Sequence, residues 1–287
     1  MPRIVYVNGS FMPIEEARVP IMDRGFLFAD GIYEVSAVLQ GRLIDNEPHL
    51  ARLDRSLKEI RIANPYSAAQ WTELEQELVR RNRLSEGLVY MQVTRGVAER
   101  EYGFPADATP TVMMFTQPKT MIGSPLADTG ASVITVPDLR WKRRDIKSIG
   151  LLAQVLAKQA AAEAGVNEAW MVEDGLVTEG GSSTAFIITT DRKVVTRPLS
   201  TAVLPGITRL SVMRLSQESG LTIEERPFSV EEALAAAEAF YTSASSLVMP
   251  IVRIDGKPVA DGVPGVLTRR LRRTYLEMAG VAVGAAA

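Results

Sequence analysis

Strand-like and helix-like patterns follow one another along this chain in an irregular order, and this order limits the possible folds more than any other feature. Two hairpin patterns come first, turning at Asn8-Gly9 and at Gln40-Gly41. Helical spacing of apolar residues follows, then more strands, without a regular strand–helix–strand repeat. We therefore expect an α+β fold rather than a doubly wound parallel sheet.

The 287 residues suit two domains. A stretch rich in Pro, Gly and polar residues at 119–129 has no clear period and is interpreted as the linker between a smaller N-terminal domain at 1–118 and a larger C-terminal domain at 130–287. The patterns predict helices within 47–62, 67–84, 151–165, 206–220 and 265–280, and strands within 3–13, 31–44, 87–96, 110–117, 131–138, 168–198 and 239–259.

Composition excludes several classes of chemistry. The chain has no cysteine, which rules out disulfides, thiolate nucleophiles and Cys-ligated metals, and it has a single histidine, His49, for which a packed or capping role is favoured. A net charge of -2 gives no reason to expect nucleic acid or an anionic membrane as a partner. We expect a cytoplasmic protein without a metal site, whose proton transfers, if it is an enzyme, fall to Lys, Tyr, Asp, Glu or a cofactor.

Lys147 lies where a basic segment meets an apolar, alanine-rich helical pattern. A catalytic lysine must lose its proton near neutral pH, which requires burial or positive neighbours. Lys142, Arg143 and Arg144 are close in sequence, so the surroundings permit activation without establishing it. A lysine bound to pyridoxal phosphate would also need a carboxylate for the pyridine nitrogen, a phosphate cradle and a group for the substrate carboxylate.

Seven short blocks occur in an order that points to one family. They are "DGIYEV", "HLARLDRS", "VTRG", "DIKSIGLLAQVLAKQAA", "VTEGGSSTAF", "LPGITR" and "YTSASS". Together they resemble a fold-type IV pyridoxal-phosphate aminotransferase, and most closely the D-amino-acid aminotransferases, over residues 3–279. The resemblance implies a two-domain α+β fold with the active site between the domains and a larger C-terminal domain that binds the cofactor.

The resemblance also assigns roles to the residues of these blocks. Lys147 matches the Schiff-base lysine that moves the proton of the substrate, and Glu179 matches the carboxylate paired with the pyridinium nitrogen. Arg52 matches the phosphate-binding arginine, and Leu204 would pack on the cofactor ring. The remaining phosphate contacts would come from the turns at Ile207, Thr208, Ser243 and Ala244, where Ala244 replaces a frequent hydroxyl residue and can offer only its backbone amide.

The substrate-binding residues implied by the resemblance are Tyr33, Arg100, Tyr102 and Ser182. In D-type relatives an Arg-x-His pair on the loop after "TRG" reaches the neighbouring subunit and holds the substrate carboxylate. Arg100 matches that arginine, whereas Tyr102 stands in place of the histidine; a phenol can donate a hydrogen bond but cannot carry a positive charge. Arg95, at the end of a strand pattern, is a competing candidate.

The predicted activity is ping-pong transfer of an amino group from a D-amino acid resembling D-alanine to a 2-oxo acid such as pyruvate or 2-oxoglutarate, by a homodimer. The small-molecule partners are thus amino acids and 2-oxo acids. Alternatives on the same fold are an R-selective amine transaminase, a branched-chain L-amino-acid aminotransferase and an aminodeoxychorismate lyase. A non-catalytic binding relative is disfavoured because Lys147 and Glu179 are both present, and an aldolase-like lysine would leave Arg52 unexplained.

Overall fold

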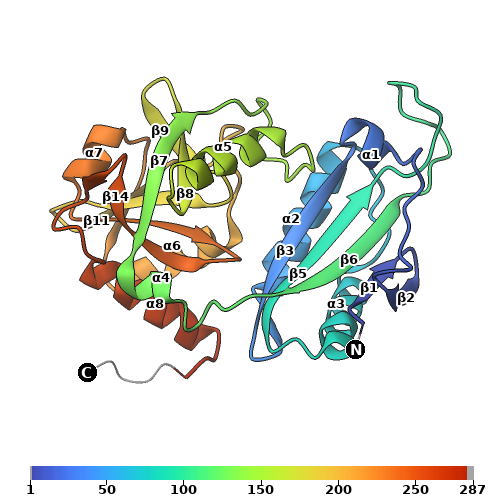
Figure 1. Cartoon of the computed structure of the whole chain (residues 1–287), viewed down its shortest axis with the longest axis horizontal. Coiled ribbons are helices and arrows are strands. Elements are labelled where there is room, and N and C mark those ends of the chain that lie inside the picture. The colour runs from blue at the N-terminus through green and yellow to red at the C-terminus, as the bar shows by residue number, and fades with distance from the viewer. Residues whose placement is uncertain (1, 283–287) are drawn as a thin grey trace. The chain divides into compact units, whose positions relative to one another are not determined.

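The computed structural model of the protein describes residues 2–282, which form two compact units (Figure 1). The first unit consists of the chain up to Thr120 together with the segment Ile146–Gly150. The second consists of Met121–Asp145 and the chain from Leu151 onward. The five-residue segment that carries Lys147 therefore packs with the first unit, although the chain on both of its sides belongs to the second.

The first unit is built on a six-stranded antiparallel sheet in the order β2-β1-β6-β5-β3-β4. Both predicted hairpins are present, and Asn8, Gly9, Gln40 and Gly41 all have positive φ, as two-residue turns of this kind require. The strands are β1 (Ile4–Val7), β2 (Ser10–Pro13), β3 (Gly31–Leu39), β4 (Arg42–Ile44), β5 (Glu86–Thr94) and β6 (Thr111–Pro118).

Two long helices cover one face of this sheet, and a short helix precedes β3. The helices are α1 (Arg24–Phe28), α2 (Asn46–Glu59) and α3 (Ala68–Asn82). α3 starts with a capping box between Ser67 and Gln70. Leu53 of α2 and Trp71 of α3 belong to the same buried core as the alternate β3 residues that point to this face. The sheet thus has one face inside the core, while Tyr33 of β3 points to the other face.

The second unit contains a nine-stranded mixed sheet in the order β12-β11-β10-β13-β14-β7-β8-β9, with β15 paired to β14. Its strands are β7 (Ala131–Pro137), β8 (Glu168–Glu173), β9 (Leu176–Gly180), β10 (Thr184–Ile188), β11 (Lys193–Thr196), β12 (Thr222–Glu225), β13 (Glu238–Ser243), β14 (Leu247–Ile254) and β15 (Lys257–Pro258). Its helices are α4 (Pro125–Thr129), α5 (Leu152–Glu163), α6 (Ile207–Glu218), α7 (Val230–Ala235) and α8 (Val266–Met278).

Pairing in the second unit is parallel between β7 and β8, β7 and β14, and β11 and β12, and antiparallel elsewhere in the sheet. Such a mixture of pairings, with helices interspersed irregularly, confirms the predicted α+β class. Four short elements, α1, α4, β12 and α7, were not predicted from the sequence. Within residues 2–282, none of the helices has the length and apolar character needed to cross a membrane.

Candidate active site

Lys147 is held at the edge of the first unit's sheet by its backbone. Its carbonyl accepts a 2.9 Å hydrogen bond from the Tyr33 amide, and its own amide donates to Ser56 Oγ at 3.5 Å. β4 pairs only with the far end of β3, so the segment 146–150 lies beside the part of β3 that begins at Gly31. Lys147 is half-buried, and its ammonium nitrogen lies 4.2 Å from the centroid of the Tyr33 ring. The main chain of Lys147 is therefore fixed, while its amine lies over an aromatic face.

Glu34, Arg52 and His49 form a buried ionic cluster on the helical face of the same sheet. Glu34 accepts from Arg52 Nε at 2.7 Å and from Arg52 Nη2 at 2.8 Å, and it contacts His49 Nδ1 at 2.9 Å. Burial by itself would raise the pKa of Glu34, but the charge and hydrogen bonds of Arg52, assisted by His49, outweigh it and hold that pKa at about 2. Glu34 thus stays ionised and fixes the plane of the Arg52 guanidinium.

His49 is kept neutral by its surroundings. Burial is the main cause of its lowered pKa, and the positive charges of Arg52 and Lys147 add to it, whereas Glu34 acts in the opposite direction. The sole histidine of the chain is therefore a packed residue that bonds to Glu34, and it does not carry a positive charge that would compete with its neighbours.

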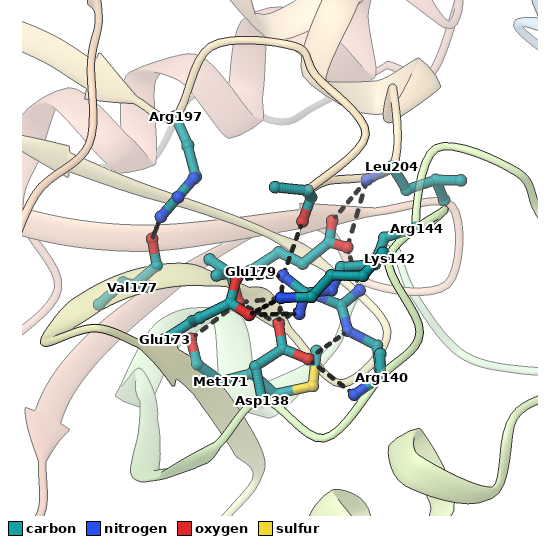
Figure 2. A network of polar contacts seen from close by, with 12 residues as sticks. Asp138, Arg140, Lys142, Arg144, Met171, Glu173, Val177, Glu179, Arg197 and Leu204 are labelled. Atoms are coloured by element: carbon teal, nitrogen blue, oxygen red, sulfur yellow. Dashed lines mark hydrogen bonds and ion pairs between the residues drawn. The ribbon is translucent and has the colours of Figure 1, made fainter.

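Glu179, on β9 in the second unit, lies at the centre of a buried polar network (Figure 2). Arg140 Nη1 donates to Glu179 Oε1, and the amide of Leu204 lies 3.2 Å from both carboxylate oxygens. Arg140 also binds Asp138 through Nε at 2.9 Å and Nη2 at 2.7 Å, and Thr178 Oγ1 donates to Asp138 at 2.6 Å. One guanidinium is thus shared by two buried carboxylates.

The two carboxylates of this network respond differently to burial. For Asp138, burial would raise the pKa, but its hydrogen bonds with Arg140 and the Arg140 charge bring it down to about 2. For Glu179, burial prevails and the pKa stays raised, although Arg140 and the Leu204 amide offset part of the effect and the charge of Asp138 adds to it. The groups around Glu179 therefore do not fully compensate the negative charge of its ionised carboxylate, and a further cationic group beside it would stabilise the ionised form.

The start of α6 lacks a side-chain cap, and the glycine before it lies close to a neighbouring side chain. Gly206 is the N-cap residue, and within the described chain no side chain caps this helix. A Cβ on Gly206 would lie 2.6 Å from Thr184 Oγ1. Ile207 and Thr208, both buried, are the first residues of the helix, where free amides and the helix dipole favour an anion.

The predicted second phosphate turn joins β13 to β14 in the same unit. Ser243 ends β13, and its Oγ accepts from the Ser246 amide at 3.1 Å and lies 3.3 Å from Ser245 Oγ. Ala244 is half-buried. Ser182, predicted to bind substrate, is exposed and lies 3.4 Å from Glu168, a buried carboxylate that also binds Ser183 and Lys158.

Arg100 and Tyr102 lie together on the loop between β5 and β6. Tyr102 is 79% exposed, and its ring centroid lies 5.5 Å from that of Phe28. The Arg100 guanidinium lies 5.3 Å from the Phe28 centroid and 5.9 Å from that of Tyr102. Both predicted carboxylate-binding residues are thus presented to solvent. Arg95, the competing candidate, is instead buried and bound to Asp30 at 2.7 Å.

The sequence-predicted residues therefore form two groups in the structure. Lys147, Tyr33 and Arg52 belong to the first unit, as do Arg100 and Tyr102, while Glu179, Leu204 and the two turns belong to the second. Sequence reasoning missed Glu34, Asp138 and Arg140. A signal for Glu34 was available, because it occupies a core-facing position of an alternating strand in which Ile32, Ser36 and Val38 are also fully buried.

Comparison with known proteins identifies the family of the chain. The family model for "Amino-transferase class IV" matches residues 31–254. A D-alanine aminotransferase of Bacillus licheniformis is 42% identical over 270 residues, which are 93% of this chain and 94% of that protein. A D-alanine aminotransferase of Staphylococcus aureus strain MSSA476 is 37% identical over 272 residues, covering 94% of this chain and 96% of the relative.

Solved structures share the fold over nearly the full chain. A branched-chain amino acid aminotransferase of Escherichia coli superposes with a TM-score of 0.90 at 21% identity, covering 99% of this chain and 98% of that one. A branched-chain aminotransferase of Thermoproteus uzoniensis, with norvaline, superposes with a TM-score of 0.84 at 26% identity, covering 96% and 94%. The chain therefore belongs to the class IV aminotransferases, which confirms the predicted family, its enzyme class and its cofactor, pyridoxal 5′-phosphate.

Proposed function

We propose that this enzyme transfers the amino group of a D-amino acid resembling D-alanine to a 2-oxo acid, either pyruvate or 2-oxoglutarate, in a ping-pong cycle. The observation that carries the proposal is the position of Lys147, whose backbone is tied to β3 while its amine lies against Tyr33. The named relatives at 37% and 42% identity support the D-amino acid as donor.

Bound pyridoxal 5′-phosphate supplies a pyridinium ring that withdraws electrons from the substrate Cα. Lys147 Nζ is proposed to bind the cofactor covalently at rest, and then to take the Cα proton of the donor and return a proton in the second half of the cycle. Because the Lys147 main chain is fixed by Tyr33 and Ser56, motion is confined to its side chain.

Glu179 is proposed to hold the proton of the ring nitrogen. Its surroundings suit this role, because a buried carboxylate that must share Arg140 with Asp138 lacks a full counter-charge. A protonated ring nitrogen would supply that charge, and the ionised carboxylate would in turn keep the nitrogen protonated. Leu204, whose amide bonds to Glu179, is proposed to lie against the ring.

The phosphate is proposed to bind Arg52, the amides of Ile207 and Thr208, and the turn at Ser243 and Ala244. Two features support this assignment: Glu34 orients the Arg52 fork, and the start of α6 has no side-chain cap within the described residues.

Arg100 is proposed to bind the substrate carboxylate, with Tyr102 donating a second hydrogen bond and Tyr33 and Ser182 lining the pocket. Arg100 and Tyr102 are both exposed in the single chain. This exposure supports the proposal that the loop completes the site of a second subunit, so that the enzyme acts as a homodimer.

The test is a comparison of amino donors with 2-oxoglutarate as acceptor. D-Alanine is expected to give the highest kcat/KM, with L-leucine and (R)-1-phenylethylamine at least about 100-fold lower, and parallel lines in double-reciprocal plots. Arg100→Gln should reduce kcat/KM for D-alanine by roughly 10- to 100-fold, the loss expected for a charged hydrogen-bonded pair, without reducing turnover of the amine. Arg270→Gln, an exposed arginine on α8, is the matched control.

A higher kcat/KM for L-leucine would identify the enzyme as a branched-chain L-amino-acid aminotransferase, the activity named for the solved structures that share its fold. A higher value for the amine, unaffected by Arg100→Gln, would identify an R-selective amine transaminase. Release of pyruvate from 4-amino-4-deoxychorismate without an acceptor would indicate the lyase. Each of these results would overturn the proposed donor.

A further inference from the structure

Arg24, a residue outside the cofactor and substrate groups described above, binds the backbone of the Arg100 loop. Its side chain is 3% exposed. Nη1 donates to the carbonyl of Glu101 at 2.5 Å, and Nη2 lies 3.5 Å from the carbonyl of Tyr102. Arg24 therefore contacts the carbonyls of the two residues that directly follow Arg100.

Arg24 is itself held by a half-buried acid, Asp30, which a second arginine also binds. Arg24 Nε donates to Asp30 Oδ2 at 2.8 Å, and Arg95 binds the same carboxylate through Nε at 2.7 Å and Nη2 at 3.0 Å. Arg95 also donates to the carbonyls of Ile60 and Arg61, just after α2, so the cluster is attached to the body of the unit. Burial would raise the pKa of Asp30, but the two arginines lower it, so the acid stays ionised.

The same cluster contacts the loop at two further points. The Arg95 guanidinium lies 3.6 Å from the centroid of the Phe104 ring, a cation–π contact two residues after Tyr102 in the loop. Arg24 lies 4.7 Å from the centroid of Phe28, the ring against which Arg100 and Tyr102 also rest. The loop is thus attached by hydrogen bonds at 101–102 and by ring contact at 104.

We infer that Arg24 is a positioning residue for substrate recognition. It holds the carbonyls of Glu101 and Tyr102 and so sets the direction in which Arg100 meets the substrate carboxylate. Asp30 and Arg95 fix the guanidinium of Arg24 itself. This inference rests on the proposed role of Arg100. A guanidinium suits the task because it can serve a carboxylate and two carbonyls at once in one plane, whereas an ammonium cannot.

The first measurement is amide hydrogen exchange across residues 98–104 in full-length protein without substrate. Arg24→Gln is expected to speed exchange in this segment, while Arg226→Gln should leave it unchanged. Arg226 is a suitable control because it also binds a carboxylate and a carbonyl, through Glu232 and Pro227, in the other unit. Unchanged exchange in Arg24→Gln would overturn the inference whether or not the proposed donor is right.

The second measurement is a double-mutant cycle on the loaded enzyme with D-alanine. Arg24→Gln is expected to raise KM roughly tenfold or more with a much smaller change in kcat, and to have no further effect in the Arg100→Gln background, because it acts through Arg100. Independent effects in the double variant, or equal losses in kcat and kcat/KM, would overturn the inference.

If Arg24→Gln does not fold, Arg24→Lys, which keeps a cation beside Asp30 but loses the fork, is put through the same cycle with the same expected pattern. Failure of the proposed function gives a different result: Arg100→Gln alone then leaves the KM for D-alanine unchanged. The two failures are therefore distinguishable.

Discussion

Replacing Arg140 by Gln should destabilise the cofactor-free protein strongly, because it removes the one cation that Asp138 and Glu179 share. The three side chains are almost completely buried, with exposed fractions of 6% for Arg140, 0% for Asp138 and 5% for Glu179. Removing one partner of such a buried pair costs about 3–5 kcal/mol, and here Glu179 loses the guanidinium of Arg140 while Asp138 keeps Arg144 Nη1 at 3.3 Å. We expect a loss of this size in the free energy of unfolding at pH 8.

The loss should also depend on pH, with a sign that follows from the two carboxyl groups. In the wild type, the depressed pKa of Asp138 contributes stability that is present above its ordinary value of 3.8 and is lost as pH falls towards 2. In Arg140→Gln the pKa of both Asp138 and Glu179 rises, so the folded protein keeps protons that the unfolded chain has released. Each such group lowers stability by up to about 1.4 kcal/mol per pH unit between its unfolded and folded pKa. The loss should therefore be larger at pH 8 than at pH 5.5.

Urea unfolding of the cofactor-free protein, followed by tryptophan fluorescence at both pH values, measures this effect. Arg143→Gln is the matched control, because Arg143 also pairs with an aspartate, Asp145, but is 39% exposed; its loss should be below about 1 kcal/mol. A loss below about 1 kcal/mol for Arg140→Gln at pH 8, or an equal loss at both pH values, would refute the shared-cation account of Glu179.

Two further predictions concern single residues of the other elements. Gly206→Ala should weaken cofactor binding at least about tenfold in an absorbance titration, because the new Cβ would lie 2.6 Å from Thr184 Oγ1. Gly123→Ala is the control and should not weaken binding, because a Cβ at that position meets open space. Equal cofactor affinities of the two variants would contradict the phosphate assignment. Glu75 is buried, and its burial raises the pKa to about 8, an effect that Asn46 and Ser36 offset only in part. The folded state then holds a proton that the unfolded chain releases above about pH 4.5, so wild-type stability should fall by a few kcal/mol towards pH 8. Glu75→Gln should make this fall shallower in urea unfolding at pH 5 and 8. An unaltered pH dependence would contradict the assignment of a neutral Glu75.

The parts of the fold that were predictable from the sequence are those with a local cause. The Asn8-Gly9 and Gln40-Gly41 turns need positive φ, and short polar residues and glycine mark such positions. α1 has only five residues, too few to be stable alone, and depends on the Asp23 cap and on contacts with residues far along the chain. β12 pairs in parallel with β11 across an intervening helix, and its four residues give no periodic signal of their own.

The candidate site divides in the same way. Lys147, Glu179 and Arg52 were predicted as site residues because short blocks around them resemble those of a known family. Arg140 was not, because in sequence it is one of several arginines after β7, and its partner Glu179 is 39 positions away. Nor did the sequence indicate that Arg24 contacts the Arg100 loop, since its hydrogen bond to Glu101 joins residues 77 positions apart.

The central claim is that Lys147 is the lysine that binds the cofactor, and borohydride reduction tests it most directly. The protein is loaded with pyridoxal 5′-phosphate, reduced, digested and analysed by mass spectrometry, with Lys142→Ala as a control that should leave labelling intact. The account predicts a phosphopyridoxyl group on Lys147, one of the seven lysines in the chain, and no stoichiometric label in Lys147→Ala. A label on another lysine, or none in the wild type, would contradict it.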